Sequence, residues 1–393
     1  MVEQTYKQRY TAMYDYICQE TTLMKAFMSV KKNKGVGGID GETIVSFEKA
    51  LGKNIRELSR LLKEKRYAPA PVKRVYIPKV NGKMRPLGIP VIRDRVVQQA
   101  VRMAIEPAID KTMSESSYGF RPGRSAGQAI VAIKQHLSDG YTHVVDADIH
   151  DFFGTINRQI LMNKVRVTVP DKEVCYLIHD FLLAGVMEEG KVRMQSTGTP
   201  QGGVISPLLA NLYMNDFDKK VTSAGAKLVR YADDFVLLAR TEGGARQAYE
   251  MARDLLTKLK LSFAPEKTRV TTIEQGFDFL GYTFWKTWVY PSDKSLGKFK
   301  EKVRVLTRRQ QPQNIKMVME KLNPVIRGWG NYFTVSDGKS RMKSLDEMMR
   351  RRLRSFLAKK FALTQMYHTK YPNSFFKELG LVSLSDMLTL RHA

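Results

Sequence analysis

The sequence predicts an α+β protein with more than one domain. The chain has 393 residues, which is more than one ordinary compact domain holds and indicates two or three. Apolar residues recur at helical spacing near both ends of the chain, and short segments of strand character lie between them. Hydrophobic residues make up 43% of the chain, so it can fill real cores, which argues against general disorder.

The charge of the chain indicates a polyanionic partner. Lys and Arg number 65 against 39 Asp and Glu, for a formal net charge of +26. Nucleic acids and anionic membrane surfaces both attract such a protein. No apolar run approaches the roughly 18–20 residues that span a bilayer, and the polar first ten residues lack the apolar core of a signal peptide. We therefore expect nucleic acid and no membrane as the partner.

Cysteine and histidine usage narrows the metal chemistry. The only cysteines, Cys18 and Cys175, form no CxxC pair, which excludes a cysteine-rich zinc module and argues against a disulfide framework. A reducing cytosol fits this composition. The six His include no HExxH motif. A metal site would therefore use carboxylates and a hard ion such as Mg²⁺.

The first 65 residues read as helices joined by one glycine-rich link. Residues 47–65 carry Leu51, Ile55, Leu58 and Leu62 at helical spacing with charges between them. The link, 31–41, places glycines beside lysines, and such a loop can bring backbone amides close to phosphate. It lacks the GxxxxGK[ST] pattern of an ATP-binding loop, so a plain basic loop is the favoured reading.

Strand and helix signals alternate through the middle of the chain. Residues 72–78 alternate in hydrophobicity, and Asn81-Gly82 is a strong hairpin-turn signal. The same signals predict further strands at 144–149, at 228–238 as two strands around a turn, and at 277–285. Helical spacing predicts helices at 93–109, 208–217 and 243–259.

Basic helices dominate after residue 291. Segment 341–360 holds eight basic residues against two acidic ones. Its apolar residues follow helical spacing and form one buried stripe: Leu345, Met349, Leu353, Phe356 and Leu357. The opposite face is either a solvated charged face or a nucleic-acid groove, and we favour the groove because so many like charges repel one another. We place a domain boundary near residues 288–298.

Adjacent carboxylates provide the strongest chemical signal. Asp233 and Asp234 lie between two apolar runs, where neighbouring charges repel unless they bind a metal, although Asp is also common at a polar hairpin tip. Asp146 and Asp148 share one face of the 144–149 strand. If this strand lies beside the 228–238 hairpin, Asp148, Asp233 and Asp234 converge. Three carboxylates of this kind make a two-magnesium site for in-line phosphoryl displacement.

Eight ordered motifs resemble one known family. Residues 231–234 (Tyr-Ala-Asp-Asp), 148–153 and 199–209 resemble motifs C, A and B of reverse transcriptases, with the family's order and spacing. Support comes from five further segments: 34–41, 85–90, 117–122, 279–282 and 327–333. Over about residues 25–360, the chain resembles the reverse transcriptase/maturase of bacterial group II introns and their intron-less relatives.

The resemblance implies a right-hand polymerase that performs RNA-directed DNA synthesis from dNTPs. It implies fingers within 1–145, a palm with an antiparallel sheet at 146–290, and a basic helical thumb, or maturase domain X, at 291–393. The implied cofactors are two Mg²⁺ ions, with Mn²⁺ as a substitute. The implied partners are an RNA template, a DNA or RNA primer and group II intron RNA, in a bacterial cytoplasm. Because segment 376–384 resembles the tail of endonuclease-free relatives, we expect no target-DNA cleavage.

Residue roles follow from the same resemblance. Asp148, Asp233 and Asp234 correspond to the metal-binding carboxylates, and Ile149 is assigned to both the metal and the dNTP site. Lys267, in a turn that resembles motif D, protonates the pyrophosphate leaving group or stabilises its charge. The implied dNTP contacts are Lys79 and Arg85 on the triphosphate, Gln201 on the nucleotide and Phe153 against a 2′-hydroxyl. The expected nucleic-acid contacts are Arg121, Gly281 at the primer grip, Arg327, Arg350, Arg351 and Arg354.

One departure from the family pattern lies beside motif A. Relatives usually carry Asp where this chain has Gly154, directly after the Phe pair, whereas this chain has Asp151 directly before the pair. This position is not a metal ligand in the family, so catalysis is not in question. Asp146 is also outside the family's catalytic set, and we interpret it as a supporting or structural residue.

Three alternatives to the main interpretation stay open at the level of sequence. One is an RNA-binding splicing cofactor without significant polymerisation. Another is a domesticated, intron-free reverse transcriptase in DNA repair or phage defence. A minor one is RNA-dependent RNA synthesis. Phe153 bears on the last, because a large ring there would collide with the 2′-hydroxyl of an NTP.

Overall fold

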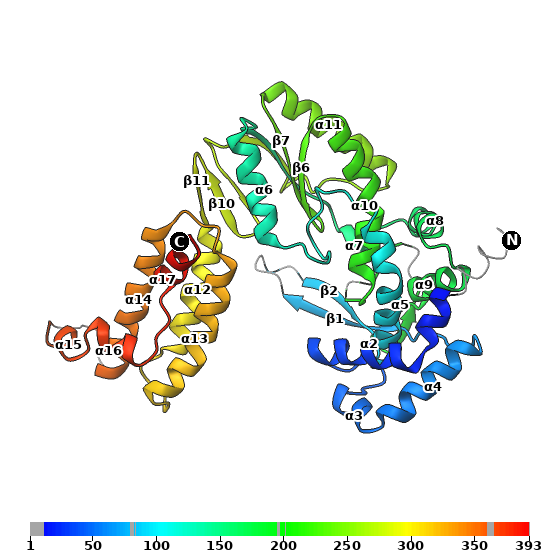
Figure 1. Cartoon of the computed structure of the whole chain (residues 1–393), viewed down its shortest axis with the longest axis horizontal. Coiled ribbons are helices and arrows are strands. Elements are labelled where there is room, and N and C mark those ends of the chain that lie inside the picture. The colour runs from blue at the N-terminus through cyan, green and yellow to red at the C-terminus, as the bar shows by residue number, and fades with distance from the viewer. Residues whose placement is uncertain are drawn as a thin grey trace. The chain divides into compact units, whose positions relative to one another are not determined.

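The computed structural model describes residues 12–78, 82, 84–194, 197–200, 202–359 and 365–392 (Figure 1). Within these residues, no helix is both long and apolar enough to cross a membrane. The chain divides into two compact units, which are described one at a time. Unit 1 comprises Met1–Ser125, Ala147–Leu237 and Arg246–Arg269, and unit 2 comprises Ala126–Asp146, Leu238–Ala245 and Val270–Ala393.

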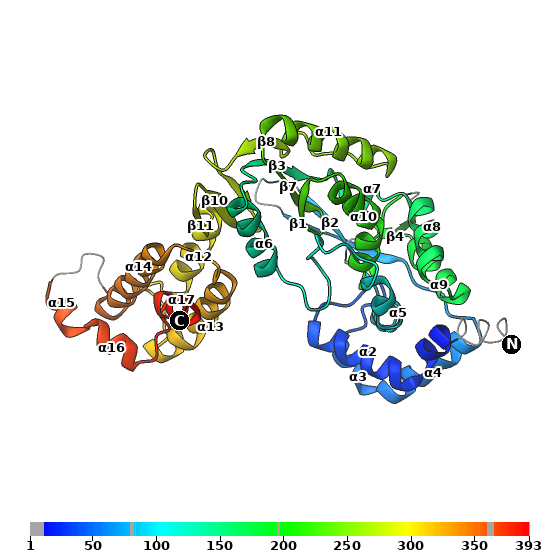
Figure 2. The same cartoon turned by 45° about the horizontal axis from the view of Figure 1, so that its top comes forward.

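Unit 1 begins with packed helices. Residues 12–18 are helical and precede α2 (Glu20–Asn33), α3 (Ile44–Lys49), α4 (Leu51–Lys63) and α5 (Ile92–Asp110). These helices lie together in both views (Figures 1 and 2), and the rings of Phe27 and Phe47 stack with centroids 5.4 Å apart. The single helix predicted at 47–65 is wrong, because Ala50 leaves helical geometry at φ −114° and ψ 26° and separates α3 from α4.

A four-stranded sheet follows with the order β2-β1-β4-β5. Strand β1 (Val72–Pro78) pairs antiparallel with β2 (Met84–Ile89), which confirms the predicted hairpin, although Asn81 lies outside the described residues. Two short strands complete the sheet, β4 (Val186–Glu188) parallel to β1 and β5 (Lys191–Arg193) antiparallel to β4. The sequence patterns did not predict β4 and β5, because three-residue strands carry too little pattern to be recognised.

The central region of the chain contains further helices, and one of them is largely buried. They are α7 (Phe152–Thr155), α8 (Arg158–Thr168), α9 (Lys172–Leu183), α10 (Ser206–Ser223) and α11 (Glu242–Lys258). Helix α10 begins with Pro207 in its first turn, as its rigid φ allows, and packs against α8 and β6. It buries apolar residues together with the polar Asn211, Asn215 and Asp218.

A second four-stranded sheet carries the segments that resemble motifs A and C. Its strands are β6 (Lys227–Tyr231), β7 (Asp234–Ala239), β3 (His143–Asp148) and β8 (Arg269–Thr272), in the order β6-β7-β3-β8. Because β3 lies next to β7, the predicted neighbourhood of motif A and motif C is confirmed. The burial pattern of β3 also confirms its register, since Asp146 and Asp148 are half-buried and Ala147 between them is buried.

Unit 2 combines a small sheet with a helical bundle. Helix α6 (Ala126–Ser138) belongs to it, and β9 (Phe277–Phe279), β10 (Tyr282–Trp285) and β11 (Trp288–Pro291) form an antiparallel sheet. The single strand predicted at 277–285 is therefore two strands, separated by Leu280 and Gly281 at φ +49° and +79°.

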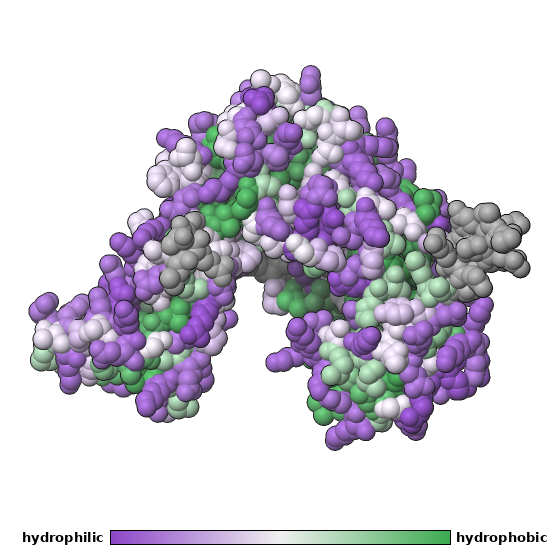
Figure 3. Space-filling view, in the orientation of Figure 1, coloured by the Kyte–Doolittle hydropathy of each residue, from purple (hydrophilic) through white to green (hydrophobic). Residues whose placement is uncertain are grey.

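The helices after β11 confirm the predicted basic helical region. They are α12 (Asp293–Leu306), α13 (Ile315–Tyr332), α14 (Lys339–Ala358), α15 (Gln365–Lys370), α16 (Asn373–Glu378) and α17 (Leu384–His392). Figure 2 shows α12, α13, α14 and α17 side by side, and Phe299 stacks on Trp329 in their core. On the face drawn in Figure 3, hydrophilic side chains cover most of these helices, with small hydrophobic patches between them.

Candidate active site and nucleic-acid interface

The turn between β6 and β7 presents two adjacent carboxylates. Ala232 has a left-handed φ of +61°, and Asp233 follows it, half-buried, before Asp234 opens β7 at an exposed position. A Cβ added at Gly119 would lie 2.6 Å from the Ala232 nitrogen, so the loop at Gly119 packs directly on the turn. This close approach requires glycine and holds the turn from one side.

Asp233 shares one electrostatic site with Asp148. Burial raises the pKa of Asp233 above its usual value, and the negative charge of Asp148 raises it further. The positive charges of Arg85 and Lys267 act in the opposite direction and lower the pKa of Asp233. The structure thus gathers two predicted ligands and two predicted cationic residues around one point in unit 1.

Lys267 supplies the positive charge beside Asp148. The two side chains form a hydrogen-bonded ion pair, and this bond raises the pKa of Lys267. The backbone holds the lysine turn in place, because the Ala264 amide donates to the Asp148 carbonyl at 2.8 Å. Lys267 is therefore at the carboxylate site, which agrees with the role predicted for it in leaving-group chemistry.

The carboxylates have suitable chemistry for a divalent ion. Carboxylate oxygens are hard ligands that suit Mg²⁺ or Mn²⁺, and burial of like charges at Asp148 and Asp233 favours a cation between them. Among the described residues, no group of three His, Cys, Asp or Glu side chains lies close enough to hold a metal ion. The predicted convergence of three carboxylates is therefore not complete in this structure, in which Asp234 is exposed and interacts with Lys267.

Ile149 follows Asp148 at the end of β3. Its side chain is buried, and it forms an antiparallel bridge with Phe263. The two hydrogen bonds of this bridge join the His150 amide to the Ser262 carbonyl and the Ala264 amide to the Asp148 carbonyl. The carbonyl of Ile149 itself takes no part in them, so its assignment to the metal and dNTP sites stays a prediction.

The backbone of Phe153 is bonded to the motif B segment. The Thr199 amide donates to the Phe153 carbonyl at 2.8 Å, and the Thr197 hydroxyl donates to the Gly154 carbonyl at 3.1 Å. Gly198 has a φ of +83°, and a Cβ there would lie 2.9 Å from both of these carbonyl oxygens. The structure thus places Phe153 directly beside the turn that carries Gln201.

The other side of that turn packs on the fingers hairpin. Gly202 has a φ of +113°, and a Cβ there would lie 2.5 Å from the carbonyl oxygen of Gly88 on β2. Arg85 is exposed on the same strand. Gln201 and Lys79 lie outside the described residues, so their dNTP contacts stay predictions. Gly202, which follows Gln201 in the chain, nevertheless packs the motif B segment against β2.

The departure noted in motif A has a steric explanation. Asp151 adopts a left-handed conformation with a φ of +36°. Its carboxylate occupies the space in which a Cβ at Gly154 would lie. A side chain at residue 154 would therefore have to displace Asp151, so the two positions depend on each other.

Arg230 is a residue of this site that none of the sequence motifs indicated. This arginine lies three residues before Asp233, is fully buried, and donates to the Ala232 carbonyl at 2.8 Å. Its salt-bridge partner, Asp218 of α10, is also fully buried. A recognisable signal was present, since Arg230 interrupts the apolar run of β6, where a charge must find a partner.

Arg121 has a structural position. Its side chain is 6% exposed and donates to the Asp110 carboxylate at 2.7 Å and to the carbonyls of Ser114 and Ser117 at 2.6 and 2.9 Å. The prediction that Arg121 binds nucleic acid is therefore corrected. Its donors hold the loop that precedes Gly119, because a buried guanidinium must satisfy its hydrogen bonds within the protein.

Gly281 forms the tip of the β9–β10 turn in unit 2. Its carbonyl accepts hydrogen bonds from the Ser292 amide at 2.8 Å and the Ser295 hydroxyl at 3.0 Å. Two tyrosines tie the turn to α13, since Tyr282 donates to the Tyr332 carbonyl and Tyr332 donates to the Leu280 carbonyl. The predicted primer grip is therefore a rigid backbone turn, although no contact with a primer is shown.

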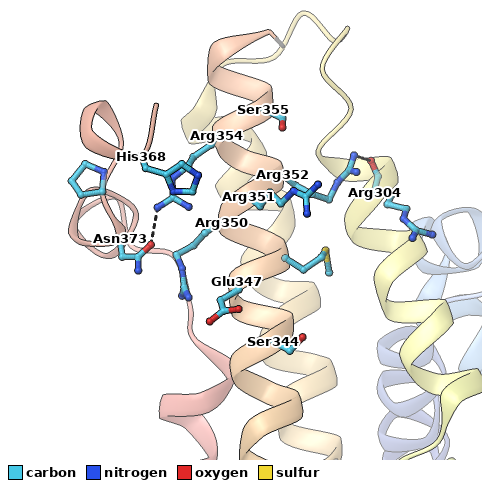
Figure 4. Close-up of a pocket in the computed structure, with 12 residues that line it drawn as sticks. Arg304, Ser344, Glu347, Arg350, Arg351, Arg352, Arg354, Ser355, His368 and Asn373 are labelled. Atoms are coloured by element: carbon cyan, nitrogen blue, oxygen red, sulfur yellow. Dashed lines mark hydrogen bonds between the residues drawn. The ribbon is translucent and has the colours of Figure 1, made fainter. Parts of the chain in front are cut away.

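The predicted basic face of α14 borders a cleft of about 850 Å³. Figure 4 shows Arg351 and Arg352 on the side of α14 toward Arg304, and Arg350 on the side that carries Asn373. Arg350 is half-buried and Arg351 is exposed, and neither has a hydrogen bond or ion pair to any other part of the described chain; Arg327 on α13 is exposed. These three arginines are available to a polyanion.

Arg354 differs from its neighbours and corrects the predicted set. It is 5% exposed and donates to the Tyr371 carbonyl at 2.8 Å and to the Asn373 side chain at 2.7 Å, as Figure 4 shows for the latter. Its guanidinium also lies over the Phe376 ring. Because α16 covers it, Arg354 attaches that helix to α14 and is not a free phosphate ligand.

Two family models match the chain. The model for reverse transcriptase (RNA-dependent DNA polymerase) matches residues 77–284, which include every catalytic motif described above. The model for the group II intron maturase-specific domain matches residues 296–372, which include most of α12, all of α13 and α14, and the arginines that line the cleft.

Individual proteins show the same relationship. Protein YkfC of Escherichia coli (strain K12) is 36% identical over 307 residues, which cover 68% of this chain and 81% of that protein. Group II intron-encoded protein LtrA of Lactococcus lactis subsp. cremoris is 29% identical over 344 residues, so the match covers 70% of this chain and 56% of LtrA. A solved Cas6-RT-Cas1–Cas2 complex matches 63% of this chain and 41% of its own with 27% identity and a TM-score of 0.40.

The matched regions and the geometry lead to one assignment. The reverse transcriptase match covers more than half of the 393 residues and contains the paired carboxylates of β3 and β7. The maturase match adds the helical region that follows β11. The chain belongs to the reverse transcriptase (RNA-dependent DNA polymerase) family, in its group II intron type with a maturase-specific domain, and has the right-hand polymerase fold of that family.

Proposed function

We propose that this chain extends a DNA or RNA primer on an RNA template by adding dNTPs at the site of Asp148, Asp233 and Asp234. The observation that carries the proposal is the pairing of β3 with β7, which joins the strand that ends at Asp148 to the strand that follows Asp233, with Lys267 ion-paired to Asp148. When bound there, two Mg²⁺ ions, or Mn²⁺ in their place, would activate the primer 3′-hydroxyl and neutralise charge on the phosphate.

The side chains around this site have complementary roles in the proposal. Arg85, with Lys79, holds the triphosphate, because a guanidinium and an ammonium on one hairpin can bind the same anion. Phe153 and Gln201 flank the nucleotide, with the Phe153 ring against the position of a 2′-hydroxyl. Lys267 moves from Asp148 to the pyrophosphate and gives it a proton or stabilises its charge.

The proposal also assigns regions of the chain to polymerase subdomains. Residues 1–145 would form the N-terminal extension and fingers with the first palm strands. Residues 146–290 would form the palm, and residues 291–393 the thumb or domain X. The change from mixed sheet to helices after β11 supports the last boundary.

Primer extension tests the proposed polymerisation. We expect wild-type protein to synthesise DNA on an RNA template with dNTPs and Mg²⁺, and Asp233→Ala to be inactive. The matched control is Asp146→Asn, on the same face of β3 but outside the proposed ligand set, which should retain most of the activity. Wild-type protein that binds RNA tightly but makes no DNA would contradict the proposal.

A second proposed function is support of intron RNA splicing. The observation that favours it is the cleft beside α14, whose unpaired arginines lie within the maturase-specific match. We expect Asp233→Ala to keep both intron RNA binding and splicing, and Arg350→Gln with Arg351→Gln to lose both. Splicing that disappears with Asp233→Ala alone would argue that the two functions are not separate.

A further inference from the structure

A fully buried arginine lies directly behind the catalytic turn. Arg230 is on β6 and is 0% exposed, although burial of a charge is costly unless its hydrogen bonds are satisfied. A guanidinium has five N–H donors, and Arg230 makes five hydrogen bonds. The acceptors are both Asp218 carboxylate oxygens, the Asn211 amide oxygen, the Ser117 hydroxyl and the Ala232 carbonyl.

The charge of Arg230 is balanced within the same core. Asp218 on α10 is also 0% exposed and receives two parallel hydrogen bonds, from Nε at 2.7 Å and from Nη2 at 2.6 Å. Burial raises the pKa of Asp218, and Arg230 opposes that rise. The two parallel hydrogen bonds of this bidentate pair give the guanidinium one fixed orientation.

That orientation points one donor at the catalytic turn. Nη1 donates to the Ala232 carbonyl at 2.8 Å, and this carbonyl belongs to the peptide that joins Ala232 to Asp233. Ala232 has a φ of +61°, a conformation that a non-glycine residue keeps only when its surroundings hold it. The hydrogen bond from Arg230 supplies part of that restraint.

The same guanidinium also orders the loop behind the turn. Nη2 donates to the Ser117 hydroxyl at 2.8 Å, and the backbone of β6 pairs with this loop through the Tyr118 amide and the Arg230 carbonyl at 2.9 Å. Asn211, which binds Arg230, donates to the Gly119 carbonyl at 2.7 Å. Gly119 in turn abuts the Ala232 nitrogen. The turn is thus held at its carbonyl and at its amide by one network.

We propose that Arg230 is a positioning residue that sets the Ala232–Asp233 peptide, and with it the Asp233 carboxylate, for nucleotidyl transfer. Arg230 is fully buried and all five of its donors bind groups of the protein. The inference rests on the proposed polymerisation at Asp233. Lysine cannot replace Arg230, because its three donors lack the planar fork that binds Asp218 and the Ala232 carbonyl together.

Steady-state kinetics on three variants test the inference. We expect Arg230→Lys to lower kcat by on the order of 100-fold, the effect of a displacement of about 1 Å at a reacting group, with the dNTP KM and RNA affinity within about twofold of wild type. Ser117→Ala removes one acceptor and should lower kcat by about three- to tenfold. Asp218→Asn removes the charge but leaves Arg230 beside Ala232, and its effect should lie between these two.

A stability-matched control separates positioning from general destabilisation. Asp94 is another buried carboxylate of unit 1, 1% exposed and bonded to the Tyr67 hydroxyl and the Ala70 amide. We expect Asp94→Asn to lower the melting temperature but to leave kcat within about threefold at temperatures where every variant is folded. Loss of kcat in Arg230→Lys that does not exceed the loss in Asp94→Asn would overturn the inference.

A binding measurement distinguishes this inference from the proposed polymerisation. Electron paramagnetic resonance detects Mn²⁺ binding without turnover, and we expect Arg230→Lys to weaken it by about tenfold or more. If wild-type protein binds Mn²⁺ but makes no DNA, the proposed polymerisation fails while weaker binding by Arg230→Lys still supports positioning. If Arg230→Lys does not fold, Ser117→Ala decides, and wild-type kcat and Mn²⁺ affinity in that variant would refute the inference.

Discussion

Two pairs of arginines, one in each unit, serve opposite purposes in this protein. In unit 1, Arg121 and Arg230 are buried, and their donors are bound to carboxylates and carbonyls around one loop and one turn. In unit 2, Arg350 and Arg351 lie on α14 with no hydrogen bond or ion pair to the rest of the described chain. A guanidinium that is satisfied within the protein organises the backbone, whereas one left unsatisfied is available to phosphate.

The largest expected effect is a loss of DNA synthesis without a loss of RNA binding. We expect Asp233→Asn to lower the rate of DNA synthesis by about 1,000-fold, or about 4 kcal/mol, because it removes a charge that supports the divalent ions. RNA affinity should stay within about twofold, since α14 is unchanged. Single-turnover primer extension and filter binding measure the two effects. Parallel loss of both would show that the turn and the arginine face are not independent.

The next largest expected effect is a difference in the free energy of unfolding between variants at a buried arginine and at an exposed one. We expect Arg121→Ala to lower the free energy of unfolding by about 2 kcal/mol, because Asp110 and two carbonyls lose a charged donor. Arg351→Ala on the exposed face should change it by less than about 0.5 kcal/mol. Urea denaturation measures the free energy of unfolding of both variants. Equal losses in Arg121→Ala and Arg351→Ala would contradict the comparison.

The salt dependence of RNA binding should respond to loss of the unpaired arginines and not to loss of a buried one. We expect Arg350→Gln combined with Arg351→Gln to reduce the slope of log affinity against log salt by about two, because each arginine neutralises about one phosphate. Arg354→Gln is the matched control on the same helix, since that guanidinium is bound to Tyr371 and Asn373. It should lower stability and leave the slope unchanged. RNA titrations between about 50 and 200 mM salt measure this, and an unchanged slope in the double variant would argue against phosphate contacts there.

The smallest effect concerns the ion pair of Lys267 with Asp148. This bond raises the folded-state pKa of Lys267, so its stabilisation is fully present below the unfolded value of about 10.4 and is lost as pH rises through the folded value. Because the Lys267 side chain is 59% exposed, the difference between wild type and Lys267→Met should stay below about 1 kcal/mol. Denaturation of the metal-free proteins should show that this difference in the free energy of unfolding is constant from about pH 7 to 9 and smaller above about pH 10.5.

A control variant isolates the ion pair from loss of one positive charge. Lys258→Met removes an exposed lysine at the end of α11 and should show no such pH-dependent difference. If the difference in the free energy of unfolding between wild type and Lys267→Met instead grows with pH, Asp148 does not stabilise the charged lysine.

The sequence by itself determined the family, the order of the motifs and the local strand and turn setting of Asp148, Asp233 and Asp234. Asp146 and Asp148 share a face because side chains alternate along a strand, and a strand–turn–strand signal surrounds Asp233 and Asp234. Helical spacing likewise located α5, α11 and α14 to within two residues at each end. These features depend on contacts between residues that are close in the sequence, so their patterns are readable.

Only the tertiary structure decided which charges face solvent. Arg350, Arg351 and Arg354 are within one turn of α14, yet among the described residues Arg354 alone of the three donates hydrogen bonds to Tyr371 and Asn373. Arg121 and Arg230 meet their partners only after distant segments pack together, with Asp218 of α10 beside β6. Burial of an ion depends on every group that surrounds it in space, and residues far apart in the chain supply those groups. Local spacing contains no information about them, so the structural roles of these arginines could be found only in the folded protein.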